Sequence, residues 1–475
     1  MNQPLSFHPI DWAILIAFAL SQAFIGIRLT RRRETTPRKQ DFLLDGRRLT
    51  LPVFVASLVS TWYGGILGVG EYTYKYGISN WLVFGVPYYL WAAFFALKLA
   101  AKARRSPYVS ISDHLYEHYG KAAGIVGTAL VFVMTVPAAY VLMLGVMFRL
   151  FFGWPLWVGV VCGALLAVLH VHTGGFRSVV RTDVLQFITM FGGIAIILPF
   201  CFFQFGGWKF LSGALPPAHF TWHGGNSMQY VLIWYVIATD TLIEPAFYER
   251  CYAARSEAVA RRGIIVSIFF WCLFDFMTTT VGLYARAIIP QLADPVAAFP
   301  ALAAKILPPV ALGLFFVGIF ATVISTVDSY AFLAAIALGR DLIWRNLKQP
   351  DRWTITFLTR VGLWSSAVLS VLLAMISQSV VDLWHDLGTI GGPALVVPML
   401  VTFSDRWRLP PRWATISMVA SGGTSLAWLL WGRFSPHGYP LSLEPIIPGL
   451  ILSFFFYFLR REEILHSVTH SGGGS

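Results

Sequence analysis

An all-α protein that crosses a lipid bilayer many times is predicted from three features of this 475-residue sequence. First, 57% of the residues are hydrophobic and 12% are charged, against a charged fraction of ~25% in soluble domains. Second, apolar runs long enough to cross a hydrocarbon layer of ~30 Å recur along nearly the whole chain. Third, the basic residues gather in alternate loops. The net charge of +12 is therefore interpreted as a topology signal, and no nucleic-acid partner is expected.

Hydropathy predicts thirteen transmembrane helices, numbered here as spans 0 to 12: 10–29, 51–76, 80–101, 123–152, 155–174, 183–204, 227–248, 262–289, 308–338, 355–376, 379–403, 412–432 and 443–460. Span 0 precedes Arg31–Arg33 and lacks a basic segment before it, so we interpret it as a retained span and not as a secretory signal. If the N-terminus is outside, the outer segments hold few of the 35 Lys and Arg residues, namely Lys75, Arg149, Lys209, Arg286, Lys305 and Arg433. This asymmetry predicts an outer N-terminus and an inner C-terminus.

The segments between the spans are too short to fold by themselves. We therefore expect one transmembrane domain at residues 1–465 and a tail at 466–475, whose final Ser-Gly-Gly-Gly-Ser resembles an artificial linker. The four cysteines are widely spaced and none belongs to a Cys/His cluster, which argues against a zinc site or a disulfide framework.

Two spans carry signs of a helix break within the membrane. Span 1 contains Gly64, Gly65, Gly68 and Gly70, although glycines at this spacing can also serve only as a packing surface. Span 6 contains Thr241-Leu-Ile-Glu244, a capping-box pattern that Pro245 follows directly. Five elements separate the two candidate breaks, and spans 3 and 8 are both unusually long. Such correspondence between halves points to an inverted-repeat transporter with its binding sites at the interrupted helices.

Four stretches next to or within these spans carry a resemblance: Asp41–Arg48, Gly174–Gln186, Phe247–Arg250 with Arg261–Gly263, and Ala321–Ser329. In order and spacing they resemble the sodium:solute symporter family, which includes bacterial proline, sialic acid and sugar carriers. The resemblance covers residues 1 to about 460. It implies two inverted five-helix repeats, spans 1–5 and 6–10, with spans 0, 11 and 12 peripheral.

The resemblance also implies a function. The expected activity is secondary active transport, in which sodium drives symport of a small organic solute into the cell by alternating access. Sodium is the expected coupling ion, with no further metal and no cofactor. The expected partners are the solute, sodium and the lipid bilayer of a bacterial cytoplasmic (inner) membrane, with a periplasmic N-terminus and a cytoplasmic C-terminus. Neither the solute nor the oligomeric state follows from the sequence.

The family's sodium site, carried onto this chain, lies between the middle of span 1 and span 8. The resemblance implies backbone carbonyls of Leu58, Thr61 and Thr322 and hydroxyls of Ser325 and Thr326 as ligands, a set of oxygens that suits a hard cation. The alternative is that Ser325 and Thr326 bond back to carbonyls four residues earlier in their own helix.

A second cation site or ion exit is implied at Asp183, with Ser325, Asp328 and Ser329 as its partners. An acid within a span is a functional hypothesis by default, because burying it without a cation or a proton is costly. Two carboxylates there could hold a proton instead of a sodium ion. Alternatively, Asp183 is a helix-start residue that complements the helix dipole.

The solute site is predicted from charges within the spans. These are acidic at Glu71, Asp240, Glu244, Asp275, Asp328, Asp382 and Asp386, whereas Arg360 is the only clearly internal base. The resemblance places Glu244 near the solute and Trp62, Tyr63 and Gly65 beside the break in span 1. Asp240, another acid of span 6, is a further candidate contact. An aromatic and acidic pocket favours a neutral or amine-bearing solute. The alternatives are that Glu244 only partners Thr241, that Trp62 only packs, or that half-helix N-termini bind a carboxylate.

Three other classes of protein are alternatives to a symporter. A sodium-dependent channel would need a repeated filter segment, which the sequence lacks. An enzyme would need a catalytic signature such as HExxH or GxSxG. None is present, and His170 and His172 are two apart on a helix and face different ways. A transporter-fold sensor without coupled transport remains an alternative, although no signalling domain follows span 12.

Overall fold

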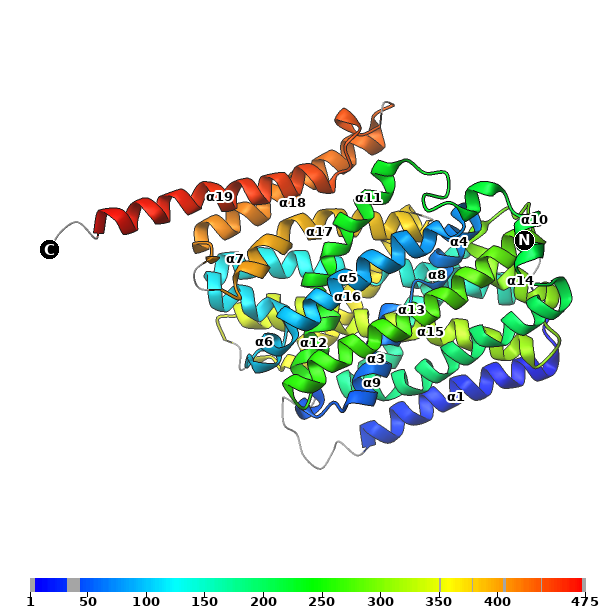
Figure 1. Cartoon of the computed structure of the whole chain (residues 1–475). Helices are drawn as coiled ribbons and strands as arrows, with labels where there is room; N and C mark the ends of the chain where they lie inside the picture. The colour runs from blue at the N-terminus through cyan, green and yellow to red at the C-terminus, as the bar shows by residue number, and fades with distance from the viewer. Residues whose placement is uncertain are drawn as a thin grey trace.

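The computed structural model describes residues 5–31, 43–349, 352–377, 379–404, 407–436 and 438–471. Within these ranges the chain is almost entirely helical, which confirms the all-α prediction. Asp41 and Phe42 of the first family-like stretch and the last four residues of the expected tail lie outside the described residues. The helices form one bundle, with α1 along one edge and α18 and α19 along the opposite edge (Figure 1).

The helices follow the predicted spans closely. In the first half they are α1 (Pro9–Arg31), α3 (Leu51–Trp62), α4 (Ile66–Tyr76), α5 (Val86–Lys98), α6 (Ala100–Arg105), α7 (Ile111–Thr135), α8 (Ala138–Phe152), α9 (Leu156–Phe205) and α10 (Trp208–Ala214). In the second half they are α11 (Met228–Ile237), α12 (Pro245–Ala253), α13 (Glu257–Ile288), α14 (Ala298–Ile306), α15 (Ala311–Ala335), α16 (Ile355–Ile376), α17 (Val380–Val401), α18 (Pro411–Phe434) and α19 (Ile446–Ser471). Predicted spans 4 and 5 both fall in α9, where Gly175, at φ 62°, turns the chain between them.

Seven helical stretches of the described residues are long and apolar enough to cross a membrane, with α7–α8 and α11–α12 each counted as one stretch. Helices α3 and α4 make an eighth if the pair is one broken span. The remaining predicted spans correspond to shorter apolar helices, such as 9–25, 156–172 and 446–459, or to α17 and α18, which did not meet the same test. The count of thirteen therefore stays a prediction. Helix α19 runs to Ser471, beyond the expected domain boundary at 465.

Helix α15 lies at the centre of the bundle and is held there by two close contacts. A Cβ atom on Gly193 of α9 would lie 2.6 Å from the Cα atom of Gly318, so the two backbones touch, as small residues permit in membrane proteins. At the other contact the buried Asp11 of α1 accepts hydrogen bonds from the backbone N–H groups of Val310 (2.8 Å) and Gly313 (3.0 Å). These bonds satisfy the first turn of α15 from a neighbouring helix.

The break predicted in span 1 is confirmed. Helices α3 and α4 are bent by 55° at residues 63–65. A Cβ atom on Gly64 would lie 1.9 Å from the Thr326 hydroxyl oxygen of α15, and one on Gly65 would lie 2.0 Å from the Trp384 ring of α17. The glycines are therefore needed because two other helices approach the broken segment there.

The second break has a different cap from the one the sequence suggested. Helix α11 ends at Ile237, a 3-10 segment runs from Ala238 to Ile243, and α12 begins at Pro245. Glu244 itself is the N-cap, and its carboxylate accepts a hydrogen bond from the Ala246 N–H at 3.2 Å. The capping-box interpretation with Thr241 as the cap is thus wrong. Proline starts a helix at its first position, because it has no N–H to satisfy, so the residue before it takes the cap.

The chain segments that flank α3 and α12 are joined by two backbone hydrogen bonds. Leu49 N–H donates to the Ala253 carbonyl at 3.0 Å, and Arg255 N–H donates to the Leu49 carbonyl at 3.0 Å. The start of α3 and the end of α12 are therefore fastened side by side.

Candidate ion and solute site

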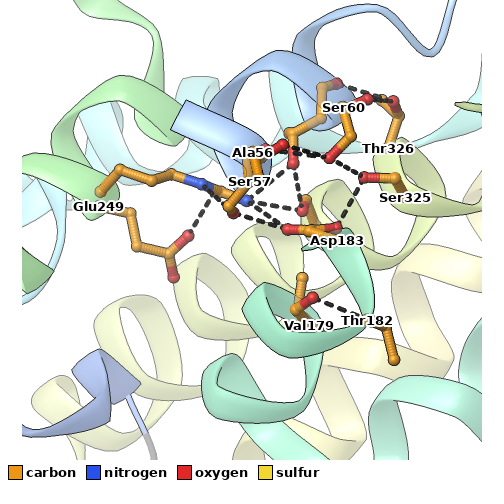
Figure 2. A network of polar contacts seen from close by, with 12 residues as sticks. Ala56, Ser57, Ser60, Val179, Thr182, Asp183, Glu249, Ser325 and Thr326 are labelled. Carbon is orange, nitrogen blue, oxygen red and sulfur yellow. Dashed lines mark hydrogen bonds and ion pairs between the residues drawn. The ribbon is translucent and has the colours of Figure 1, made fainter. Parts of the chain in front are cut away.

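The first candidate site lies where the end of α3 meets α15. The last carbonyl groups of a helix have no partner within it, and here the Thr326 hydroxyl, 2.7 Å from the Thr61 carbonyl oxygen, donates to it. Ser325 donates to Asp183 Oδ1 at 2.7 Å and lies 3.0 Å from the Ser60 hydroxyl. Figure 2 shows Ser60, Asp183, Ser325 and Thr326 gathered around this point. Both span 8 hydroxyls thus reach across to other helices.

Of the five sodium ligands that the resemblance implied, three converge: Thr61, Ser325 and Thr326. The Thr322 carbonyl lies 3.4 Å from the Thr326 hydroxyl, while the Thr322 hydroxyl itself donates to the Gly318 carbonyl at 2.7 Å. Leu58 lies three residues before Thr61 on α3 and is fully buried. The arrangement offers backbone and hydroxyl oxygens from two helices at one point, which is the donor set that a sodium ion prefers.

Asp183 of α9 lies beside this point and is fully buried. Its carboxylate accepts hydrogen bonds from the hydroxyls of Ser57 at 2.6 Å and Ser325 at 2.7 Å. The guanidinium of Arg250 lies 3.8 Å away. Asp183 therefore has two donors and an internal cation.

Arg250 is an internal base that was not expected from the sequence. It is 0% exposed and donates to the hydroxyls of Thr61 and Ser329, both at 2.8 Å, to Ser57 at 3.2 Å and to the Glu249 carboxylate at 3.0 Å. Arg360 was expected to be the only clearly internal base, and this expectation is wrong, because Arg250 is buried whereas Arg360 is exposed on α16. Every residue of the short helix α12 is buried, so its arginine points into the bundle.

Among the described residues, neither Asp328 nor Ser329 forms a hydrogen bond with Asp183, and each has other partners. Asp328 is paired with His170, and its other oxygen, Oδ1, is buried with no partner among the described residues. Ser329 contacts the Thr61 hydroxyl at 2.8 Å and Arg250. His170 and Asp183 lie on either side of the turn at Gly175 in α9, and each binds a residue of α15. Of the three expected partners, only Ser325 binds Asp183 directly.

The second candidate site is a cavity of about 190 Å³ beside the two helix breaks. Its wall includes all five residues expected near the solute: Trp62, Tyr63, Gly65, Asp240 and Glu244. Trp62 also packs against Phe247 and Trp271, with ring centroids 5.1 and 5.9 Å apart. Trp62 therefore both lines the cavity and packs against neighbouring rings. Thr61, with its carbonyl at the first site, is the residue before Trp62, and the break in span 1 therefore serves both sites.

Several residues of the cavity were not singled out from the sequence. They include Asp275, which accepts hydrogen bonds from the hydroxyls of Tyr63 and Tyr89. Aromatic residues of five helices complete much of the wall, among them Tyr140, Trp234, Trp271, Tyr330 and Trp384. Asp275 had a signal, since it is an acid within a span. The aromatic residues had none, because tryptophan and tyrosine are common throughout this chain.

Comparison with known proteins decides the family. The model of the sodium:solute symporter family matches residues 42–404. The chain belongs to the sodium:solute symporter family. The sodium/pantothenate symporter of Escherichia coli is 24% identical over 94% of this chain and 95% of that protein. The human high affinity choline transporter 1 is 30% identical over 206 residues, which are 41% of this chain and 35% of that protein.

A solved Na⁺-coupled sialic acid symporter, in a substrate-bound outward-open state, superposes with a TM-score of 0.78 at 15% identity, covering 96% of this chain and 98% of that one. This likeness shows that the two share a transporter fold. Proteins of the family are transporters and not enzymes, and the matches support sodium-coupled transport by an inner-membrane protein.

Proposed function

We propose that this sodium:solute symporter is a secondary active transporter that carries a small organic solute into the cell together with sodium, by alternating access. One observation carries the proposal. The break between α3 and α4 presents the Thr61 carbonyl to the α15 hydroxyls on one side, and Trp62, Tyr63 and Gly65 to the cavity on the other. Because one segment contributes to both sites, occupancy of either site alters the geometry available to the other.

The proposed sodium ligands are the carbonyls of Leu58, Thr61 and Thr322 and the hydroxyls of Ser325 and Thr326. The proposed solute contacts are Trp62, Tyr63, Gly65, Asp240 and Glu244. Asp183 and Ser329, with Asp328 paired to His170, lie beside the sodium ligands and form the proposed exit route or second cation site. At Asp183 the guanidinium of Arg250 already supplies one positive charge.

The proposed topology has thirteen spans, with an N-terminus in the periplasm and a C-terminus in the cytoplasm. Helices α3 to α9 correspond to the first inverted repeat and α11 to α17 to the second. Two interrupted elements, α3–α4 with its bend and α11–α12 with its 3-10 segment, support this pairing, because each is the first element of its proposed repeat.

Sodium binding can be tested before the solute is identified. A ligand that binds only the folded protein raises its melting temperature. We expect NaCl to raise the melting temperature of the purified protein in detergent above that in KCl at equal ionic strength. Thr326→Ala should abolish most of this difference, because it removes a ligand oxygen.

Thr359→Ala is a matched control. Thr359 is also buried in a membrane helix, but its hydroxyl donates to the Ile355 carbonyl of its own helix at 2.8 Å, far from the site. This variant should keep the sodium effect. Equal melting temperatures in sodium and potassium for the unmodified protein, together with no uptake driven by a sodium gradient in proteoliposomes, would refute sodium coupling.

A further inference from the structure

The cavity at the two helix breaks carries a charge pattern that bears on the solute. Three carboxylates line it, those of Asp240, Glu244 and Asp275. None of the described residues in its wall is a lysine, an arginine or a histidine. A cation in such a cavity favours the ionised form of these acids and gains a counter-charge, whereas an anion finds no group of opposite charge.

Two of the three carboxylates already have partners. Asp275 accepts hydrogen bonds from two tyrosine hydroxyls, those of Tyr63 and Tyr89. Glu244 accepts one from the Ala246 N–H and lies at the N-terminus of α12, where the helix dipole favours a negative charge. Neither acid needs a ligand to satisfy it.

Asp240 differs from both. It lies in the 3-10 segment of the second break, and its Oδ1 atom is shielded from solvent with no hydrogen-bond partner among the described residues. A Cβ atom on Gly392 of α17 would lie 2.0 Å from this oxygen, so the carboxylate fits there only because that residue is glycine. A carboxylate oxygen without a donor is costly at such a position, and a bound cation would offset that cost.

The aromatic part of the wall suits the same kind of ligand. Trp62, Trp234, Trp271 and Trp384 all border the cavity, and Trp62 has Tyr88 as a neighbour at a centroid distance of 5.8 Å. The faces of aromatic rings attract cations, and alkylated ammonium groups are the ligands that such groups of rings recognise best.

The helix ends at the breaks offer little to a carboxylate. The N-terminus of α12 is capped by Glu244. At the N-terminus of α4 the Trp384 ring lies over the first turn, since Cβ atoms on Gly65 and Gly68 would lie 2.0 and 2.8 Å from it. An anionic solute would therefore find neither a basic side chain nor a free half-helix N-terminus.

We propose that the solute of this cavity is a small organic cation, an alkylated ammonium compound that is held between aromatic rings with Asp240 as its counter-ion. The inference rests on the proposed function, because it assigns a substrate class to the same site. Asp240 is thereby a specificity-determining residue.

The charge requirement can be tested on the unmodified protein with ligands of matched shape. Choline and 3,3-dimethylbutan-1-ol differ mainly in that a neutral carbon replaces the charged nitrogen. We expect choline, in sodium, to raise the melting temperature at concentrations at least about tenfold lower than the neutral alcohol. Glycine betaine, which adds a carboxylate, should be weaker than choline, and pantothenate and butyrate should be weakest. The proposal is overturned if no cation stabilises the protein, or if pantothenate or butyrate acts at lower concentration than choline.

A substitution then tests Asp240. In Asp240→Asn the advantage of choline over 3,3-dimethylbutan-1-ol should largely disappear, whereas the affinity for the neutral alcohol should change little. Asp382→Asn is the matched control, because Asp382 is an exposed acid in the first turn of α17 and does not line the cavity. An Asp240→Asn protein that keeps the full preference for choline would remove Asp240 from the proposal.

The same assay separates this inference from the proposed function. The melting-temperature difference between sodium and potassium without any solute, and its loss in Thr326→Ala, report on the ion site alone. If that difference is present and the preference for cations is absent, the substrate class is wrong and sodium coupling stands. If the sodium effect is absent as well, sodium coupling is refuted, and the proposed substrate class, which rests on it, is refuted with it.

Discussion

Asp183 and Asp240 both place a carboxylate inside the helix bundle, yet their surroundings differ. Asp183 is fully buried, accepts hydrogen bonds from Ser57 and Ser325, and lies 3.8 Å from the guanidinium of Arg250. Asp240 faces a cavity, and one of its oxygens has no partner among the described residues. A negative charge that already has an internal cation can hold the structure together, whereas one without such a partner is suited to bind a cation from outside.

The largest effect is expected from removing the internal cation. Arg250→Met leaves the carboxylates of Asp183 and Glu249 buried without a counter-charge, and breaking a buried ion pair costs about 3–5 kcal/mol. We expect a large drop in melting temperature in detergent and a low yield of folded protein. Combining Arg250→Met with Asp183→Asn and Glu249→Gln should recover part of the loss. An Arg250→Met protein as stable as the unmodified one would show that Arg250 is not a structural partner of these acids.

The second prediction contrasts the two aspartates directly. Asp183→Asn should lower the melting temperature, because Arg250 loses part of its compensation. Asp240→Asn should leave it unchanged or raise it when no solute is present, because this change removes a charge that has no partner. Both variants replace one oxygen by nitrogen, so their shapes match. If the melting temperature falls by the same amount in both variants, the two aspartates do not differ in the way proposed here.

A smaller effect is expected from the pair of His170 and Asp328, which lies beside Asp183 and Arg250. Protonated His170 holds the Asp328 carboxylate and repels other cations, whereas neutral His170 leaves this carboxylate free to attract sodium. The sodium concentration needed for half-maximal effect should therefore fall as the pH rises from about 6 to about 8. His170→Gln and Asp328→Asn should each flatten this dependence, and the double variant should change it no further. An unaltered profile in both single variants would make the pair structural.

The smallest effect is expected from single cysteines that report the sidedness of the ion site. Ser212 in α10 and Ser256 before α13 are both exposed, and neither borders the cavity. Ser212→Cys should react with a membrane-impermeant maleimide added to intact cells, and Ser256→Cys should react only after lysis, with uptake little changed in either. The opposite labelling pattern would show that the topology is the reverse of the one proposed. The end of the bundle that carries Arg250 and Ser256 would then face the outside of the cell.

Some of this site could be predicted from the sequence. The four glycines of span 1 indicated a break, because such a cluster weakens a helix, and Pro245 located the start of α12. The burial of Arg250 could not be predicted, because a positive charge near a span end is usually a topology signal, and only the packing of α12 shows otherwise. The contact between Gly65 and Trp384 joins residues more than 300 positions apart, and a single sequence contains no record of such a contact.

The fastening of Leu49 to the Ala253–Arg255 segment has a kinetic consequence. Helices α3 and α12 belong to opposite halves of the chain, yet neither can swing away from the other at this end without breaking two backbone hydrogen bonds. The rate at which the Leu49 and Arg255 amide protons exchange for deuterium therefore reports how often these two helix ends separate. If both breaks move as one body during transport, these two amides should exchange slowly and at a common rate, even while the helices around the cavity change their positions.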